Sequence, residues 1–168
     1  NQPLNSWNVS KAVGVADNFG LGGMFWSATD FNQPLSNWNV SNCKNFNFMF
    51  SNTKAFNQSL ATWNFANAMT LNNMFNSAAA FNSPVPGNTF TKVTALSGMF
   101  FSTKVFNQPV DDWNVSTVTN FDGVFSNAYA FNKPVNSWDV SKGLYFDTVF
   151  ESAIAFNQPL NNWNVSSA

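Results

Sequence analysis

One motif recurs through this chain at a fixed spacing of 25 residues, and this period limits the fold more than any other feature. A phenylalanine followed by an asparagine opens each copy, at Phe31, Phe56, Phe81, Phe106, Phe131 and Phe156. A tryptophan and a second phenylalanine keep the same period in most copies. Units of this length cannot bury their own apolar faces and must stack, so residues 1–168 are expected to form a single repeat domain of about seven units. The array starts and stops inside a unit, so we expect it to be a fragment of a longer chain.

Two apolar patterns alternate within each unit. Trp38 and Val40 are separated by one polar residue, which is the period of a short strand with these side chains inward. The following apolar positions are spaced by three and four residues, as on one face of a short helix or 3₁₀ turn, at Phe46, Met49, Phe50 and Thr53. These patterns predict an α/β solenoid with a parallel sheet on one side and short helices on the other.

Two units depart from the common pattern. The first carries six extra residues between Ser10 and Met24, in a glycine-rich stretch that we interpret as a flexible excursion. The unit that Phe81 opens has Pro86-Gly87-Asn88 in place of the usual approach to tryptophan, with Asn88 at the tryptophan position. Because Phe90 still occupies the inward site, this unit predicts a local bulge or a loosened ladder.

The repeated side chains are expected to form columns through the stack. The phenylalanines that open the units should make one buried column and the tryptophans a second. The asparagines that follow these phenylalanines should hydrogen-bond main-chain groups or one another, because buried amides require partners.

The motif L-x-x-W-x-V-x-x-C at residues 35–43 resembles the core of leucine-rich repeats, with tryptophan in one leucine place. Together with the recurring FNQPL, WNVS and MF, it resembles the BspA-type branch of these repeats, found on mycoplasma surface lipoproteins and in some algal proteins. The resemblance covers nearly the whole chain. It implies a right-handed, leucine-rich-repeat-like stack in a secreted or surface setting, and it implies no catalytic residues.

Composition argues against several functions. The net charge of -1 gives no reason to expect nucleic acid as a partner. No apolar run approaches the roughly 18 residues of a membrane span, so no direct span is expected. There is no histidine and one cysteine, Cys43, which we interpret as a small buried filler. The only adjacent acidic pair is Asp111-Asp112. We therefore expect no enzyme activity, no metal site and no cofactor.

Two surfaces are candidates for binding. The first is a polar recognition face of outward positions near the predicted strands, at Asn39, Asn64, Asn114, Asp139, Ser116 and Ser141. The alternative is a solvated surface without a ligand. The second is a set of apolar residues at positions that other units leave polar or small, namely Phe101, Tyr129, Ile154 and Trp26. Exposed apolar residues in neighbouring units indicate a contact surface for a protein partner.

These observations favour a non-enzymatic structural or protein-interaction module of a secreted or cell-surface protein. The alternative is a scaffold or linker subunit buried in a larger multiprotein assembly, for instance inside an organelle, with partners packed against the uncapped ends of the array.

Overall fold

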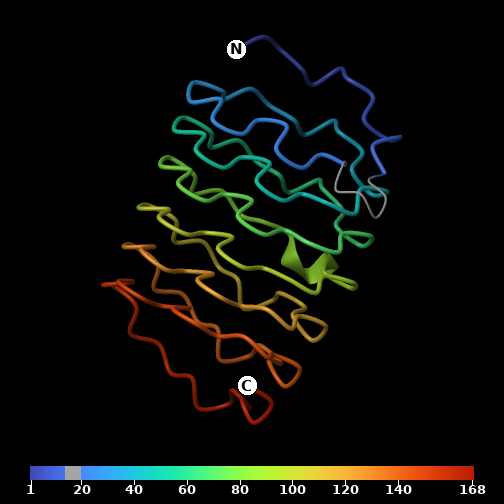
Figure 1. The fold of residues 1–168 in the computed structure, drawn as a ribbon. Coiled ribbons are helices and arrows are strands. Elements are labelled where there is room, and N and C mark those ends of the chain that lie inside the picture. The colour runs from blue at the N-terminus through green and yellow to red at the C-terminus, as the bar shows by residue number, and fades with distance from the viewer. Residues whose placement is uncertain (14–19) are drawn as a thin grey trace.

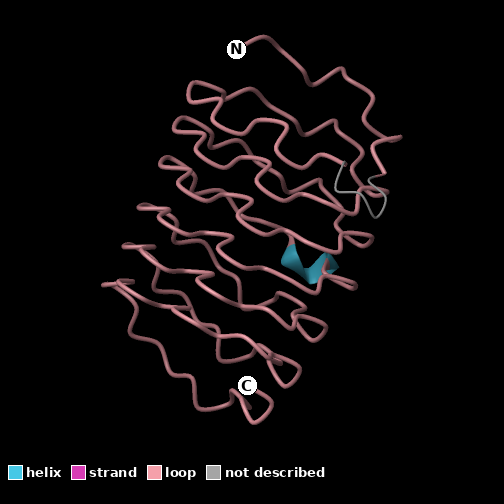
Figure 2. Cartoon of the chain, in the orientation of Figure 1, coloured by secondary structure: helices cyan, strands magenta, loops and turns pink. Residues whose placement is uncertain are grey.

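The computed structural model describes residues 1–13 and 20–168. Successive lengths of the chain form coils that lie on one another, with the N-terminus and the C-terminus at opposite ends of the stack (Figure 1). In the described residues the only helix is the 3₁₀ helix η1 (Gly87–Thr89), and there is no strand (Figure 2). The predicted α/β solenoid, with a leucine-rich-repeat-like parallel sheet and short helices, is therefore wrong. Turns and irregular links make up the coils instead.

In the segment predicted as a helix, a hydrogen bond of 3.1 Å from the Ser51 N–H to the Phe48 carbonyl overlaps two consecutive β-turns. The two consecutive turns span residues 46–49 and 50–53, and their closing N–H···O=C bonds measure 3.1 and 3.2 Å. The third residues of these turns, Phe48 and Asn52, have φ values of 58° and 59°, as a type II turn requires. The first and last residues of each turn point inward and are buried, namely Phe46, Met49, Phe50 and Thr53. Two adjoining turns thus reproduce the three- and four-residue spacing of a helix face.

Backbone hydrogen bonds join these paired turns to the same turns in the next coil. Every second N–H group in the turns donates to a carbonyl group of the following coil. The Phe46 N–H donates to the Thr70 carbonyl (3.1 Å), and the Phe50 N–H donates to the Met74 carbonyl (2.8 Å). Beside them runs a line of isolated parallel bridges through Asn45, Thr70, Ala95, Asn120 and Tyr145. β-Turns separate the successive hydrogen bonds between coils, and the bridges are isolated. These bonds therefore hold the coils in register without forming a sheet.

Side chains join the coils on the side where the sheet was expected. The indole Nε1–H of Trp63 donates to the Leu35 carbonyl of the preceding coil at 3.0 Å. The predicted asparagine hydrogen bonds are confirmed: each Oδ1 accepts the N–H of the equivalent asparagine one coil later at 2.8–3.0 Å, in Asn32, Asn57, Asn82, Asn107 and Asn132. These asparagines are only partly buried or exposed. Trp38 and Val40 do point inward, each 2% exposed, although they lie in no strand.

Stacked aromatic rings fill the core, and the predicted phenylalanine column is confirmed. Centroids of neighbouring rings in this column are 5.8–6.1 Å apart from Phe31 to Phe156. A second phenylalanine column, from Phe25 to Phe150, has spacings of 5.5–5.8 Å. The tryptophan column is present on both sides of the unit that Phe81 opens, with centroid distances of 5.9 Å (Trp113–Trp138) and 6.4 Å (Trp38–Trp63).

The two irregular units are the one that contains η1 and the one at the N-terminus. In the unit that Phe81 opens, η1 takes the place of the missing tryptophan, and Gly87 lies directly against the indole of Trp113. Phe90 is fully buried, as predicted for the inward position. In the first unit, residues 14–19 of the predicted excursion lie outside the described residues.

Candidate interaction surfaces

The predicted polar recognition face is a row of turns closed by their own side chains. Asn39 Oδ1 accepts both the N–H and the hydroxyl of Ser41, at 3.1 and 2.7 Å. The same hydroxyl bond recurs in Asn114–Ser116 and Asp139–Ser141, and Asn64 accepts only the N–H of the residue two positions later, which is an alanine. All of these residues are exposed or half-buried. Because the acceptor oxygens serve the local turns, the sequence of this row has a structural explanation that needs no ligand.

The Asp139 turn yields a testable titration. The Ser141 hydroxyl and, next, its N–H lower the pKa of the Asp139 carboxyl below its ordinary value of 3.8. A lowered folded-state pKa means that the contribution to stability is present above the unfolded-state pKa and is lost as pH falls through the folded value. We expect Ser141→Ala to raise the Asp139 pKa toward 3.8, measured by carboxyl ¹³C NMR titration. An unchanged midpoint would show that the hydroxyl bond does not stabilise the carboxylate.

Of the apolar contact candidates, two occupy equivalent positions on consecutive coils. Tyr129 is 40% exposed and Ile154, 25 residues later, is 81% exposed. Phe101 lies one coil earlier and three positions back within its coil, and it is half-buried. The structure thus presents Tyr129 and Ile154 as neighbours on the surface, whereas Phe101 belongs to a different column.

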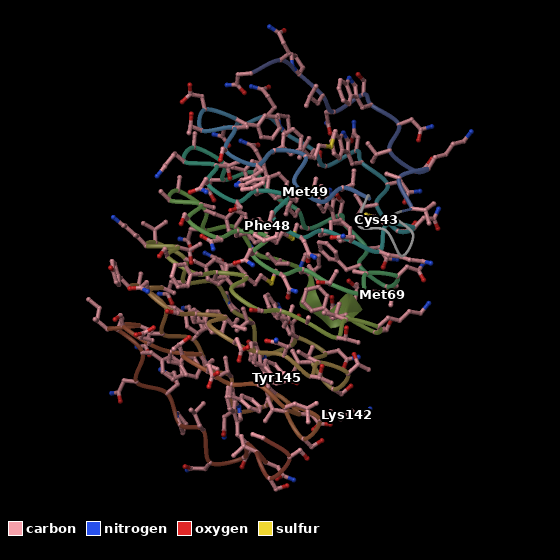
Figure 3. All side chains as sticks on the ribbon, in the orientation of Figure 1. Cys43, Phe48, Met49, Met69, Lys142 and Tyr145 are labelled. Carbon is pink, nitrogen blue, oxygen red and sulfur yellow. The ribbon has the colours of Figure 1, made fainter. Side chains whose placement is uncertain are left out.

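Trp26 lies at the other end of the stack and pairs with a residue that was not among the candidates. Its ring centroid is 5.8 Å from that of Phe48 in the next coil, with the planes inclined by 31°. Trp26 is 60% and Phe48 40% exposed. Phe48 is labelled in Figure 3, beside the buried Met49. The signal for Phe48 in the sequence was its place in a column that otherwise holds glycine, asparagine or threonine.

Some other exposed apolar residues were not among the contact candidates predicted from the sequence. Met69 (49%) and Leu144 (47%) occupy equivalent positions three coils apart, and Tyr145 (54%) follows Leu144. Figure 3 places Met69 well away from Tyr145 along the stack. The column of Met69 and Leu144 carries lysine or threonine at Lys44, Thr94 and Thr119, which could have identified these two residues. They are too scattered to form one patch.

Cys43 and the acidic pair Asp111–Asp112 lie apart from one another, the first in the core and the pair at the surface. Cys43 is 1% exposed, which confirms its predicted burial, and burial raises the pKa of its thiol, so the nucleophilic thiolate is disfavoured. Asp111 and Asp112 are exposed at the edge of a shallow depression of about 320 Å³, whose other lining residues include Pro84 and Pro109.

The C-terminal end of the stack presents apolar side chains. Phe146, Phe150 and Trp163 are only half-buried and line a hollow of about 390 Å³ together with Leu160, Val149, Val165 and Ala168. This is the surface at which packing against an uncapped end was expected.

Two absences in the described residues bear on binding. Within residues 1–13 and 20–168, no three histidine, cysteine or acidic side chains gather in a way that could hold a metal ion. The same part of the chain contains no helix with the length and apolar character needed to cross a membrane.

The sequence model of one protein family matches the chain twice, over residues 1–88 and 88–168, so that the matches extend over the whole chain. That family is described as "Mycoplasma protein of unknown function, DUF285". Neither the curated proteins nor the solved structures include a match.

Proposed function

The chain belongs to this mycoplasma family of unknown function, and from that premise we propose that it is a non-enzymatic structural and protein-interaction module of a secreted or cell-surface protein. The observation that carries the proposal is the exposed pair Tyr129 and Ile154. Equivalent positions elsewhere hold Thr29, Lys54, Ala79 and Lys104. The exposed part of an apolar side chain contributes nothing to folding, whereas full burial of a large apolar residue against a partner contributes up to roughly 1.5–3 kcal/mol.

The location outside the cell rests on a different argument. The resemblance of the FNQPL and WNVS motifs to BspA-type surface repeats supports a surface setting. A long stack of coils held together largely by local turns and neighbouring contacts also suits a display module, since its side surfaces remain accessible along the whole array.

The alternative is a scaffold or linker subunit inside a larger assembly, for example in an organelle. Phe146, Phe150 and Trp163 line an apolar hollow. Its coverage by a different chain would support this alternative, whereas its coverage by a further unit of the same chain would not. Analytical ultracentrifugation of the 168-residue chain separates the two proposals. A soluble monomer supports the display module, and aggregation that a partner relieves supports the buried subunit.

The contact surface is tested by replacing Ile154 with lysine while a photo-cross-linker occupies position 129. We expect the fold to be retained, because Lys54 and Lys104 already occupy this column. Photo-cross-linking from position 129 should give a discrete protein adduct on cells that carry the protein. The Ile154→Lys variant should weaken formation of that adduct by at least about tenfold, the equivalent of 1.4 kcal/mol.

A matched control places the cross-linker at Asp112, which is exposed and occupies a different position in the repeat. Equal adducts from positions 112 and 129 would indicate non-specific contact. An adduct that is insensitive to Ile154→Lys would exclude this surface as the interface.

A further inference from the structure

Phe48 has a backbone conformation that is unfavourable for its side chain. Its φ is 58°, in the left-handed region where a bulky residue is an outlier. Five other coils have a positive φ at the equivalent position, and there the residues are Gly23, Asn73, Gly98, Gly123 and Thr148. Glycine and asparagine tolerate this region, whereas the β-branched Thr148, like Phe48, does not tolerate it readily. Residues held in such conformations are concentrated at functional sites, where the surrounding structure maintains them.

Burial does not explain the phenylalanine either, because 40% of Phe48 is exposed. The chain provides an internal comparison. Phe101 occupies the same position in its coil as Trp26. In the next coil it faces Gly123, and a Cβ added to this glycine would lie 3.9 Å from the Phe101 ring. Phe101 is half-buried there. Trp26 meets Phe48 at the corresponding place and remains 60% exposed. Phe48 therefore helps to keep Trp26 at the surface.

A hollow of about 280 Å³ adjoins the two rings, near the lower limit of small-molecule sites. Its lining residues are all uncharged: Gly22, Gly23, Trp26, Asn45, Asn47 and Phe48. A Cβ at Gly23 would meet nothing within 4 Å, so the space above this glycine is open.

One amide beside the hollow is held in a fixed orientation. Asn47 Oδ1 accepts the Thr70 hydroxyl at 2.7 Å and the Asn72 N–H at 2.8 Å. These bonds fix which end of the amide accepts. The Nδ2 group of Asn47 makes no hydrogen bond within the described residues, and it remains a donor for a ligand.

We propose that Trp26, Phe48 and Asn47 form a binding site for a neutral carbohydrate. The C–H face of a sugar ring is apolar and slightly positive, so it complements the negative faces of two inclined aromatic rings. Its hydroxyl groups accept from a fixed amide donor such as Asn47 Nδ2. The uncharged lining matches a neutral sugar, because it offers no counter-charge for an ionic ligand. This site is separate from the Tyr129–Ile154 surface.

The test is isothermal titration calorimetry of the 168-residue chain with neutral linear hexasaccharides of glucose, mannose, galactose, xylose and N-acetylglucosamine. We expect saturable binding of at least one of them. Trp26→Ala and Phe48→Asn should each weaken that binding at least about tenfold. Phe48→Asn should not lower the thermal unfolding midpoint, since Asn73 adopts the same conformation one coil later with a φ of 56°.

Trp7→Ala is the matched control, because Trp7 is 52% exposed and lies outside the hollow. It should leave affinity unchanged. Absence of saturable binding to every sugar at millimolar concentration would overturn the proposal. It would also be overturned if Trp26→Ala and Trp7→Ala had equal effects, or if Trp26 proved to bind a protein and no sugar. The Tyr129–Ile154 contact would be unaffected by any of these results.

Discussion

Replacing Phe106 by alanine is expected to lower the free energy of unfolding by about 3–5 kcal/mol. Phe106 is fully buried and stacks on Phe100 with centroids 3.9 Å apart. It also contacts Phe81 and Phe131 in the coils on either side, at 6.0 and 6.1 Å. Alanine would leave a cavity bounded by three rings that are themselves held in columns, so the site cannot collapse around it. Urea denaturation followed by circular dichroism measures the loss.

Phe156 provides the control within the same column. It is half-buried at the last described coil, with Phe131 on one side only, at 5.9 Å. Phe156→Ala should therefore destabilise the chain clearly less than Phe106→Ala. Equal losses would mean that stability depends on phenylalanine content and not on enclosure within the column.

The columns were predictable from the sequence because they depend only on the period. Once coils of 25 residues stack in register, Phe56 must lie over Phe31, and Asn57 over Asn32, whatever the local conformation. The hydrogen bonds of the asparagines followed from the same argument, since a repeated amide beside a repeated backbone N–H finds the same partner in every coil.

The local conformation was not predictable from apolar spacing alone. Inward residues at spacings of three and four fit a helix face and also fit two adjoining four-residue turns. The distinguishing signal was the residues between the inward apolar ones: Gly98, Gly123 and Asn127 lie at positions with positive φ. A helix has no need for such residues at a regular place in every unit, whereas type II turns do. Phe48 and Thr148 weaken this signal at the first turn, and serines weaken it at the second turn, because neither set is glycine or asparagine: Ser27, Ser77, Ser102 and Ser152.

Surface exposure was predictable only in part, since it depends on the neighbouring coil. Trp26 and Phe101 share one position in the repeat, yet Trp26 is exposed and Phe101 is half-buried. The difference lies 22 residues further along the chain, where Phe48 faces one ring and Gly123 the other. A comparison of each candidate with the equivalent residue of the following coil would have revealed the Trp26–Phe48 pair.

Replacing Gly87 by alanine is expected to destabilise the chain by about 3 kcal/mol, the upper end of the usual cost of overpacking. The added Cβ would lie 2.2 Å from Cγ of Trp113 and 2.3 Å from its Cδ1. The indole cannot easily withdraw, because Trp113 is 4% exposed and its Nε1–H donates to the Val85 carbonyl at 3.1 Å. Trp138 also stacks on it at 5.9 Å. Thermal unfolding of the variant measures the loss.

Two further variants separate this clash from other effects of removing a glycine. Gly23→Ala places a Cβ where nothing lies within 4 Å, but at a φ of 66°, so it measures only the backbone cost of roughly 1–2 kcal/mol. Trp113→Leu makes room beside residue 87, so Gly87→Ala should cost much less in that background than in the parent. If the two costs are equal, the indole is not what requires glycine, and η1 (Gly87–Thr89) is not an adaptation to the missing tryptophan at Asn88.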